Sequence, residues 1–318
     1  MGINVLSLFD GISCGQIALD RLGIKVDNYF ASEIDKHAIK VTQTNYPTTI
    51  QLGDVTKVYT SDLPKIDLLI GGSPCQGFSL AGKQLNFEDE RSKLFFEYLR
   101  ILKELKELNP NIKFLLENVK MKKEFVEVIN DLLGVEGKFI NSSLVSAQNR
   151  PRWYWTNTCI SEIKDKGILL NDILEENIDS KYFIKDGRLK WLNTFGEVKE
   201  KDGYVAFNLT RAKCLTVMGE PSWNTTYILQ WPRGYNTGGI RGLDGKTPSL
   251  TVSSWEHNNL LLKEGMVRKL TPVECERLQT VPDKYTSCIS DAQRYKALGN
   301  GWTVDIICSI FKDMNLNQ

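Results

Sequence analysis

The segment 71–79 reads Gly-Gly-Ser-Pro-Cys-Gln-Gly-Phe-Ser and places one thiol, that of Cys75, in a short glycine-containing loop. The apolar run 66–70 precedes this loop, which predicts a buried strand that ends where the loop begins. In open α/β sheets, the loops at the carboxyl ends of the strands carry the chemistry. Because a thiolate is intrinsically very nucleophilic, Cys75 is a candidate nucleophile.

Three carboxylates come at the ends of other predicted strands. Glu33 follows the run 28–32, Asp54 follows Gly53 after a further short segment, and Glu117 follows the run 113–116. The carboxyl ends of parallel strands meet at one edge of a sheet, so we expect these side chains on the same edge as Cys75. Glu33 lies where such a sheet receives a ribose. Taken singly, each carboxylate also fits a helix cap or a solvated turn.

A glycine turn, Asp-Gly-Ile-Ser-Cys-Gly at 10–15, follows the predicted first strand 4–9 and precedes a predicted helix over 16–22. Glycines here let the backbone approach a ligand at the start of a helix. The spacing lacks the full Gly-x-Gly-x-x-Gly pattern, which favours a general cofactor site over a dinucleotide site. A nicotinamide-dependent oxidoreductase is therefore disfavoured.

The composition is that of a globular protein, with 318 residues of which 42% are hydrophobic. Its 40 Lys and Arg against 39 Asp and Glu leave a formal charge of +1, so a nucleic acid has to be bound by a local basic surface. Seven cysteines without a Cys-x-x-Cys motif, and only two histidines, predict neither a disulfide framework nor a metal site. The six cysteines other than Cys75 are expected to be packing residues.

The same features predict a cytoplasmic protein. Free cysteines suit a reducing compartment, and the first residues carry no signal-peptide pattern. No apolar stretch is long enough to cross a bilayer, so no membrane partner is expected.

Apolar strands alternate with helical patterns in the first half of the chain, which predicts an α/β fold with a mostly parallel sheet. From about residue 159 the pattern changes to short strands broken by Gly, Pro, Asn and Asp. Helical periodicity returns at 268, with a helix start at Thr271-Pro272 and a final helix over 304–311. We therefore predict one domain from 1–157 and 268–318, and a smaller irregular β-rich domain from 158–267.

The order of these motifs resembles that of the DNA (cytosine-5)-methyltransferases over nearly all of residues 3–157 and 267–312. The matching pieces are Phe9-Asp10-Gly11 through Gly15, Glu33, Asp54-Val55, Ser73-Pro74-Cys75, Glu117-Asn118-Val119, Gln148 through Arg152, the block from Arg268 to Pro282, and Gly299-Asn300. The stretches 7–12 and 91–97 resemble the vertebrate de novo branch, while the abundance of Lys, Asn and Ile suggests a bacterial or phage genome. Gly301 departs from the pattern, since relatives usually have Ser or Ala there.

The resemblance implies a Rossmann-like methyltransferase fold and a covalent mechanism at the carbon 5 position of cytosine. Cys75 would attack carbon 6 of the ring and make carbon 5 nucleophilic. Glu117 would bond the ring's N3 and exocyclic amine, and Arg152 would hold its O2. Arg150 and Gln148 would shape the site.

The implied cofactor is S-adenosylmethionine, which leaves as S-adenosylhomocysteine. Phe9 would lie against the adenine, Glu33 would bind the ribose hydroxyls, and Asp54 would bind the adenine amine. The full predicted cofactor site comprises Phe9, Asp10, Gly11, Ile12, Gly15, Glu33, Ile34, Asp54, Val55, Ser73, Pro74, Leu94, Asn300 and Trp302.

The implied partner is double-stranded DNA, from which the target cytosine is flipped into the site while the loop 79–91 closes over it. Residues 158–267 would then form a target-recognition domain. Its candidate DNA-contacting residues are Arg211, Lys213, Arg233, Arg241 and Lys246. A monomer is expected, and a cognate restriction nuclease is a possible partner.

Two alternatives remain on the same scaffold. One is an RNA methyltransferase that modifies cytosine in tRNA, which the long segment 158–267 disfavours. The other is a catalytically silent relative that binds DNA, which the presence of Cys75, Glu117 and Arg152 together disfavours.

Overall fold

The computed structural model describes residues 2–73, 90–184, 198–201, 204–207, 227–230, 239–242, 246–250, 260–263 and 266–316. The predicted nucleophile Cys75, its neighbour Pro74 and most of the predicted closing loop lie outside these residues. So do Arg211, Lys213 and Arg233. Within the described part of the chain, no helix has the length and apolar character needed to cross a membrane.

Packing divides the chain into two compact units. The first unit comprises Met1–Val145, Arg150–Asp165 and Gly301–Gln318, and the second comprises Ser146–Asn149 and Lys166–Asn300. The segment 268–300, which is predicted from the sequence to share a domain with residues 1–157, packs within the second unit. The assignment of a separate function to each domain stays a prediction.

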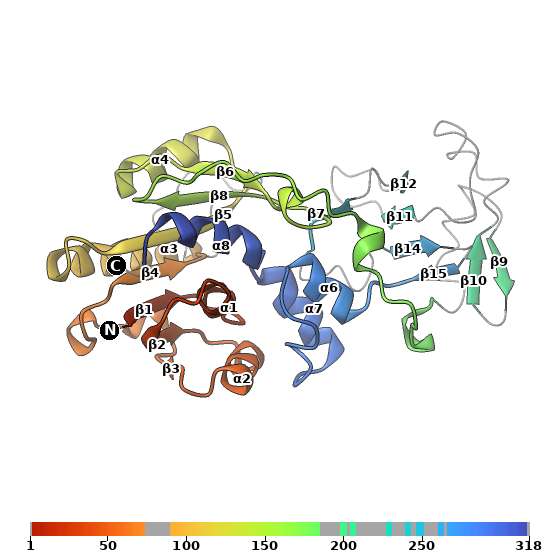
Figure 1. Ribbon diagram of the computed structural model, residues 1–318, viewed down its shortest axis with the longest axis horizontal. Coiled ribbons are helices and arrows are strands. Elements are labelled where there is room, and N and C mark those ends of the chain that lie inside the picture. Colours follow the sequence, from red (N-terminus) through yellow and green to blue (C-terminus); the bar gives the residue numbers. More distant parts are fainter. Residues whose placement is uncertain are drawn as a thin grey trace. The chain divides into compact units, whose positions relative to one another are not determined.

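The first unit contains a seven-stranded sheet in the order β3-β2-β1-β4-β5-β8-β6 (Figure 1). The strands are β1 (Ile3–Leu8), β2 (Val26–Ser32), β3 (Ile50–Gln51), β4 (Leu68–Gly71), β5 (Lys113–Val119), β6 (Lys138–Asn141) and β8 (Pro151–Thr156). The five strands from β3 to β5 are parallel, and β8 pairs antiparallel with both β5 and β6. The predicted α/β class with a mostly parallel sheet is confirmed.

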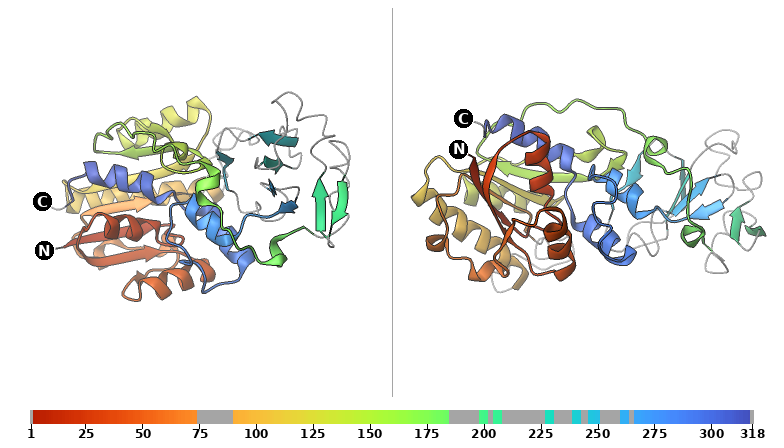
Figure 2. Two further views of the ribbon diagram at one scale, coloured as in Figure 1. Left: turned by 45° about the vertical axis from the view of Figure 1, so that its right-hand side comes forward. Right: turned by 60° about the horizontal axis from the view of Figure 1, so that its bottom comes forward.

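Helices cover this sheet on both faces, which is why its central strands are continuous apolar runs. The helices are α1 (Cys14–Arg21), α2 (Lys36–Asn45), α3 (Glu90–Leu108), α4 (Lys123–Leu133) and α8 (Val304–Asp313). In β4, Leu69 packs into a cluster with Phe95 and Leu102 of α3, whereas the next residue, Ile70, faces Gly15 of α1. Helices α1 and α8 lie side by side (Figures 1 and 2).

The second unit contains a six-stranded antiparallel sheet in the order β12-β11-β14-β15-β10-β9. Its strands are β9 (Val198–Lys201), β10 (Tyr204–Phe207), β11 (Tyr227–Gln230), β12 (Gly239–Gly242), β14 (Leu260–Lys263) and β15 (Met266–Arg268). The unit also contains the short parallel pair β7 (Gln148–Asn149) and β13 (Thr247–Pro248), and the helices α6 (Pro272–Leu278) and α7 (Asp291–Asn300). The predicted short strands of the β-rich segment are thus present.

Helix α6 begins where the sequence predicts. Thr271 is its N-cap, and its hydroxyl accepts the N–H of Glu274 at 3.1 Å. The Glu274 carboxylate in turn accepts the N–H of Thr271 at 2.8 Å, which completes a capping box with Pro272 at the first helical position.

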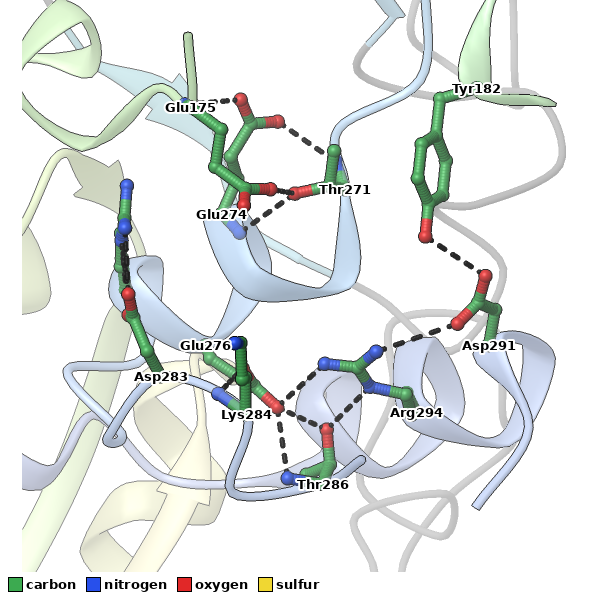
Figure 3. Close-up of polar contacts among 11 residues, drawn as sticks. Glu175, Tyr182, Thr271, Glu274, Glu276, Asp283, Lys284, Thr286, Asp291 and Arg294 are labelled. Atoms are coloured by element: carbon green, nitrogen blue, oxygen red, sulfur yellow. Dashed lines mark hydrogen bonds and ion pairs between the residues drawn. The ribbon is translucent and has the colours of Figure 1, made fainter. Parts of the chain in front are cut away.

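Two ion pairs on α6 are buried in the second unit. Arg268 donates two hydrogen bonds to the carboxylate of Glu274, at 2.7 and 2.8 Å, and Arg294 of α7 donates to Glu276 at 3.0 Å. Both carboxylates are fully buried. Glu276 also accepts the N–H of Thr286 at 2.9 Å, so it joins α6, α7 and the segment between them (Figure 3). These contacts explain why residues 268–300 form part of this unit.

Removing one partner of such a pair leaves an uncompensated buried charge. We expect Glu276→Ala to lower the free energy of unfolding by about 3–5 kcal/mol, because Arg294 is then buried without its carboxylate. The exposed pair Arg277–Asp283, at 2.6 Å, is the matched control, and Asp283→Ala should cost less than about 1 kcal/mol. Chemical denaturation followed by circular dichroism measures both. Equal losses in the two variants would contradict this account of the α6–α7 junction.

Candidate active site

The turn between β1 and α1 has an unusual backbone. Phe9, Gly11 and Ser13 all have positive φ, at 57°, 61° and 57°. For Phe9 and Ser13 this left-handed conformation costs energy, and such strain persists only where the surroundings fix it. Glu33 supplies part of that fixation, because its Oε2 accepts the N–H of Gly11 at 2.8 Å. The ends of β1 and β2 therefore meet at this turn, as the spacing predicts.

The carboxylate of Glu33 is held by two further backbone N–H groups. Its Oε1 accepts those of Ile34 and Asp35, each at 2.8 Å. The side chain of Ile34 is 78% exposed, which is high for a large apolar residue. A fixed carboxylate beside an exposed apolar side chain suits a ligand that combines hydroxyl groups with an aromatic face.

Asp54 caps a short 3₁₀ helix, Val55–Lys57, with its side chain. Its Oδ1 accepts hydrogen bonds from the backbone N–H and the hydroxyl of Thr56, both at 2.9 Å. The hydrogen bond from the Thr56 N–H contributes most to lowering the pKa of Asp54. Gly53 precedes it with φ of 74°, and Ser32 of β2 donates its hydroxyl to the Gly53 carbonyl at 2.7 Å. Asp54 is thus an ionised carboxylate fixed near the end of β2.

Asp10 belongs to the same turn and, within the described parts of the chain, is the carboxyl group with the largest upward pKa shift. Burial raises the pKa of Asp10 to about 6, although hydroxyl groups that donate to it act in the opposite direction. The hydroxyl of Tyr29 donates to its Oδ1 at 2.9 Å, and that of Ser13 donates to its Oδ2. Tyr29 was not among the predicted site residues. Its role depends on the register between β1 and β2, which no local motif reveals.

The second half of the site is centred on Glu117. This residue lies inside β5 rather than after it, because β8 pairs with β5 as far as Val119. Glu117 is 9% exposed. Its Oε1 lies 3.0 Å from Nε of Arg152 as an ion pair outside hydrogen-bond geometry, and its Oε2 accepts the indole N–H of Trp302 at 3.1 Å.

The end of β4 lies directly against this carboxylate. A Cβ atom at Gly72 would be 3.1 Å from Oε2 of Glu117 and 2.9 Å from the indole nitrogen of Trp302. The hydroxyl of the next residue, Ser73, accepts a hydrogen bond from Asn118 at 3.3 Å. Ser73 is the last described residue before the loop that contains Cys75, so this loop starts beside Glu117.

The three residues of the Gln-x-Arg-x-Arg motif have different surroundings. Arg152 contacts Glu117, as given above. Arg150 is 3% exposed and donates to the carbonyl of Gly301 at 3.0 Å; burial, with the charge of Arg152, lowers its pKa to about 10. Gln148 is fully buried in the second unit, where it donates to the Leu278 carbonyl at 3.2 Å. Arg150 and Gln148 therefore hold backbone segments.

The other predicted site residues vary in exposure. Ile12 and Val55 are buried, and Phe9 and Leu94 pack against the core cluster of the first unit. A Cβ atom at Gly15 would be 2.3 Å from Ile70, so this glycine allows α1 to approach the sheet. Asn300 ends α7 in the second unit. Their roles stay predictions.

The structure adds contacts for two further residues named from the sequence. The ammonium of Lys246, a candidate for DNA contact, donates to the carbonyls of Ile168 at 2.7 Å and Ser146 at 3.3 Å. Cys14 was expected to be inert packing, and burial does raise its pKa to about 12. The backbone N–H of Trp302 acts in the opposite direction and offsets part of this rise in pKa. Among the described residues, no cluster of His, Cys, Asp and Glu is suited to a metal ion.

The fold is that of the Rossmann-like methyltransferases, a class whose members use S-adenosylmethionine. The family model for C-5 cytosine-specific DNA methylases matches residues 3–316, so the chain belongs to that family and is a transferase. The Type II methyltransferase M1.ScrFI of Lactococcus lactis subsp. cremoris is 32% identical, over 98% of this chain and 77% of its own length. The Type II methyltransferase M.HhaI of Haemophilus parahaemolyticus is 29% identical, over 96% and 92%.

Solved structures agree on the fold. The Entamoeba histolytica methyltransferase EhMeth superposes with a TM-score of 0.66 at 18% identity, covering 99% of this chain and 98% of its own. A putative DNA modification methyltransferase from an Escherichia coli prophage gives 0.65 at 19% identity, covering 99% and 100%. At these identities the likeness shows the fold alone.

Proposed function

We propose that this protein transfers a methyl group from S-adenosylmethionine to carbon 5 of a cytosine in double-stranded DNA. The observation that supports this most is the position of Glu117, held by Arg152 and Trp302 beside the strand end that leads to Cys75. The family match and the similarity to Type II methyltransferases agree with this assignment. These relatives also support a role in a restriction-modification system.

The reaction begins with addition of the Cys75 thiolate to carbon 6 of the cytosine. A new C–S bond forms, and the electron pair of the ring's 5,6 double bond makes carbon 5 nucleophilic. The bound cofactor supplies the methyl group in activated form. A base or water then removes the proton from carbon 5, and the electron pair left behind expels Cys75 as a thiolate, restoring the double bond.

Glu117 stabilises the charge that develops on the ring during this addition. Its carboxyl group, carrying or sharing a proton, bonds N3 and the exocyclic amine of the base. Arg152 holds the O2 atom on the other side of N3 and is already adjacent to Glu117. Because a cytosine within a duplex cannot reach these groups, the base is flipped out of the helix.

The residues of the first unit fit the proposed cofactor. Glu33 offers a carboxylate fixed by three backbone N–H groups for the ribose hydroxyls, and the exposed Ile34 offers an apolar surface for the adenine. The hydrogen bonds from Thr56 lower the pKa of Asp54 and so keep it ionised, and this carboxylate can accept a hydrogen bond from the adenine amine. These three residues are contributed by the segments after β2 and β3, at the carboxyl edge of the sheet.

The raised pKa of Asp10 makes cofactor selectivity depend on pH. Since burial raises this pKa to about 6, Asp10 takes up a proton as the pH falls through that value. S-adenosylmethionine carries a sulfonium charge that its product lacks, so ionised Asp10 favours the substrate over the product. We expect the affinity for S-adenosylmethionine, divided by that for S-adenosylhomocysteine, to fall about threefold or more as the pH is lowered from about 7 to about 5. Calorimetry with each ligand at both pH values measures this ratio.

The control for this prediction is Asp10→Asn, which keeps the size of the side chain and removes its titration. In that variant the affinity ratio should not vary over the same pH range. A ratio independent of pH in the unmodified protein would place Asp10 too far from the sulfonium to act on it.

Expression in a host without cytosine methylation tests the function directly. Bisulfite sequencing of the plasmid should show cytosines protected in one short sequence context, and a Cys75→Ser plasmid should show none. If the purified protein labels tRNA and leaves duplex DNA unlabelled, the substrate is RNA and the proposal is wrong. No labelling of either substrate, with the protein folded, would favour the catalytically silent alternative.

A further inference from the structure

Trp302 contacts the carboxylate of Glu117 through its side chain. Its indole N–H donates to Oε2 of Glu117 at 3.1 Å. The two residues are 185 positions apart in the sequence, so a residue of the segment before α8 holds the carboxylate in β5.

The residues on both sides of Trp302 are held by hydrogen bonds. Arg150 donates to the carbonyl of Gly301 at 3.0 Å, and the hydroxyls of Ser142 and Thr303 lie 2.8 Å apart. Arg150 and Ser142 are almost fully buried. Buried hydrogen bonds that are fully made restrict a segment to one arrangement. The indole is thus presented to Glu117 by a rigid support.

Gly72 provides an independent indication that this contact matters. A Cβ atom there would lie 2.9 Å from the indole nitrogen of Trp302 and 3.1 Å from Oε2 of Glu117. The φ of Gly72 is not in the left-handed region, so its backbone conformation does not require glycine. A side chain at this position would instead press against both the indole nitrogen and the carboxylate oxygen, so it would displace at least one of them.

We propose that Trp302 is a positioning residue for Glu117. Its indole N–H fixes one carboxylate oxygen while Arg152 holds the other, so the carboxyl group is oriented before a base arrives. The catalytic consequence rests on the proposed function, whereas the contact itself does not.

The contact can be tested without any assay of activity. The chain has seven tryptophans, and the Trp302→Phe variant identifies the indole N–H resonance of Trp302 in a ¹H–¹⁵N spectrum. We expect Glu117→Gln to shift this resonance strongly. The indole of Trp155, which donates to Asn130 at 2.7 Å, serves as the internal reference and should not move. An unmoved Trp302 resonance would overturn the proposal whether or not the protein methylates DNA.

Kinetics test the consequence. Trp302→Phe keeps an aromatic ring but removes the donor to a charged group, so kcat should fall about 10- to 100-fold. The KM for S-adenosylmethionine should change much less. The matched control is Trp155→Phe, which loses a buried indole hydrogen bond elsewhere in the first unit and should leave kcat within about twofold.

A double-mutant cycle separates positioning from a merely structural role. In the Glu117→Gln background, Trp302→Phe should add little further loss, because both changes remove the same oriented group. Gly72→Ala should reduce kcat in the same way as Trp302→Phe. Independent losses in the double variant would show that Trp302 and Glu117 act separately and would overturn the proposal. A raised KM for S-adenosylmethionine with unchanged kcat in Trp302→Phe would overturn it too, because Trp302 would then act on the cofactor.

Discussion

The Cys75→Ser variant is expected to lose methyl transfer by on the order of 10³-fold or more. A serine hydroxyl is far less acidic than a thiol, so almost none of it is ionised near neutral pH, and the adduct at carbon 6 does not form. Without that adduct, carbon 5 is too weak a nucleophile to accept the methyl group. Single-turnover rates with labelled S-adenosylmethionine and duplex DNA measure the effect.

Binding of the cofactor should survive this change. The residues proposed to hold S-adenosylmethionine come from the ends of other strands, so calorimetry with S-adenosylhomocysteine should give nearly the same affinity for both proteins. Cys159→Ser is the matched control, because Cys159 is exposed, and full activity is expected of it. Substantial methylation by Cys75→Ser would contradict covalent catalysis, and activity lost equally in both serine variants would point to a general effect of removing thiols.

Replacement of Glu117 by Gln should lower kcat by about 10²–10⁴-fold. The amide has nearly the same size, but it cannot supply a proton to N3 of the ring and loses the charge that Arg152 and Trp302 hold in place. We expect the KM for S-adenosylmethionine to stay within about threefold of the original, since the cofactor site lies on other residues. Steady-state kinetics with both substrates varied provide these values.

The control for this variant is Glu127→Gln on α4. Glu127 is an exposed carboxylate that pairs with Lys123 at 3.2 Å, and such surface pairs contribute little. Its activity should equal that of the unmodified protein within about twofold. Turnover near the original level in Glu117→Gln would show that stabilisation of the ring depends on another group.

Apolar runs and helical spacing predicted much of the first unit because its elements depend on local patterns. The predicted strand 4–9 corresponds to β1, Ile3–Leu8, and the predicted final helix 304–311 corresponds to α8, Val304–Asp313. The parallel arrangement then brought Glu33 to the glycine turn, where it bonds Gly11. Patterns of this kind report burial directly, which is why they were informative here.

The packing of residues 268–300 was not predictable from such patterns. A helical period shows that α6 and α7 form, but it does not show which sheet they pack against. Their place in the second unit depends on the buried pairs of Arg268 with Glu274 and Arg294 with Glu276. Charged residues normally lie on the surface, so no local pattern indicates that these four are buried.

The site shows a similar limit. Sequence motifs singled out Glu117, Arg152 and Trp302, but with separate roles in base binding and cofactor binding. Trp302 is 185 residues from Glu117 in sequence, and only the folded chain shows that one bonds the other. Likewise, Arg150 stands in a motif linked with the base, whereas its guanidinium donates to the backbone of Gly301.

The most direct test of the central claim is a covalent trap. The protein is incubated with S-adenosylmethionine and a duplex in which 5-fluorocytosine replaces the methylated cytosine, and then examined by mass spectrometry under denaturing conditions. Fluorine at carbon 5 cannot leave as a proton does, so the methylated adduct should persist. We expect a protein–DNA species whose crosslinked peptide contains Cys75. Free protein alone, or a crosslink at another residue, would contradict it.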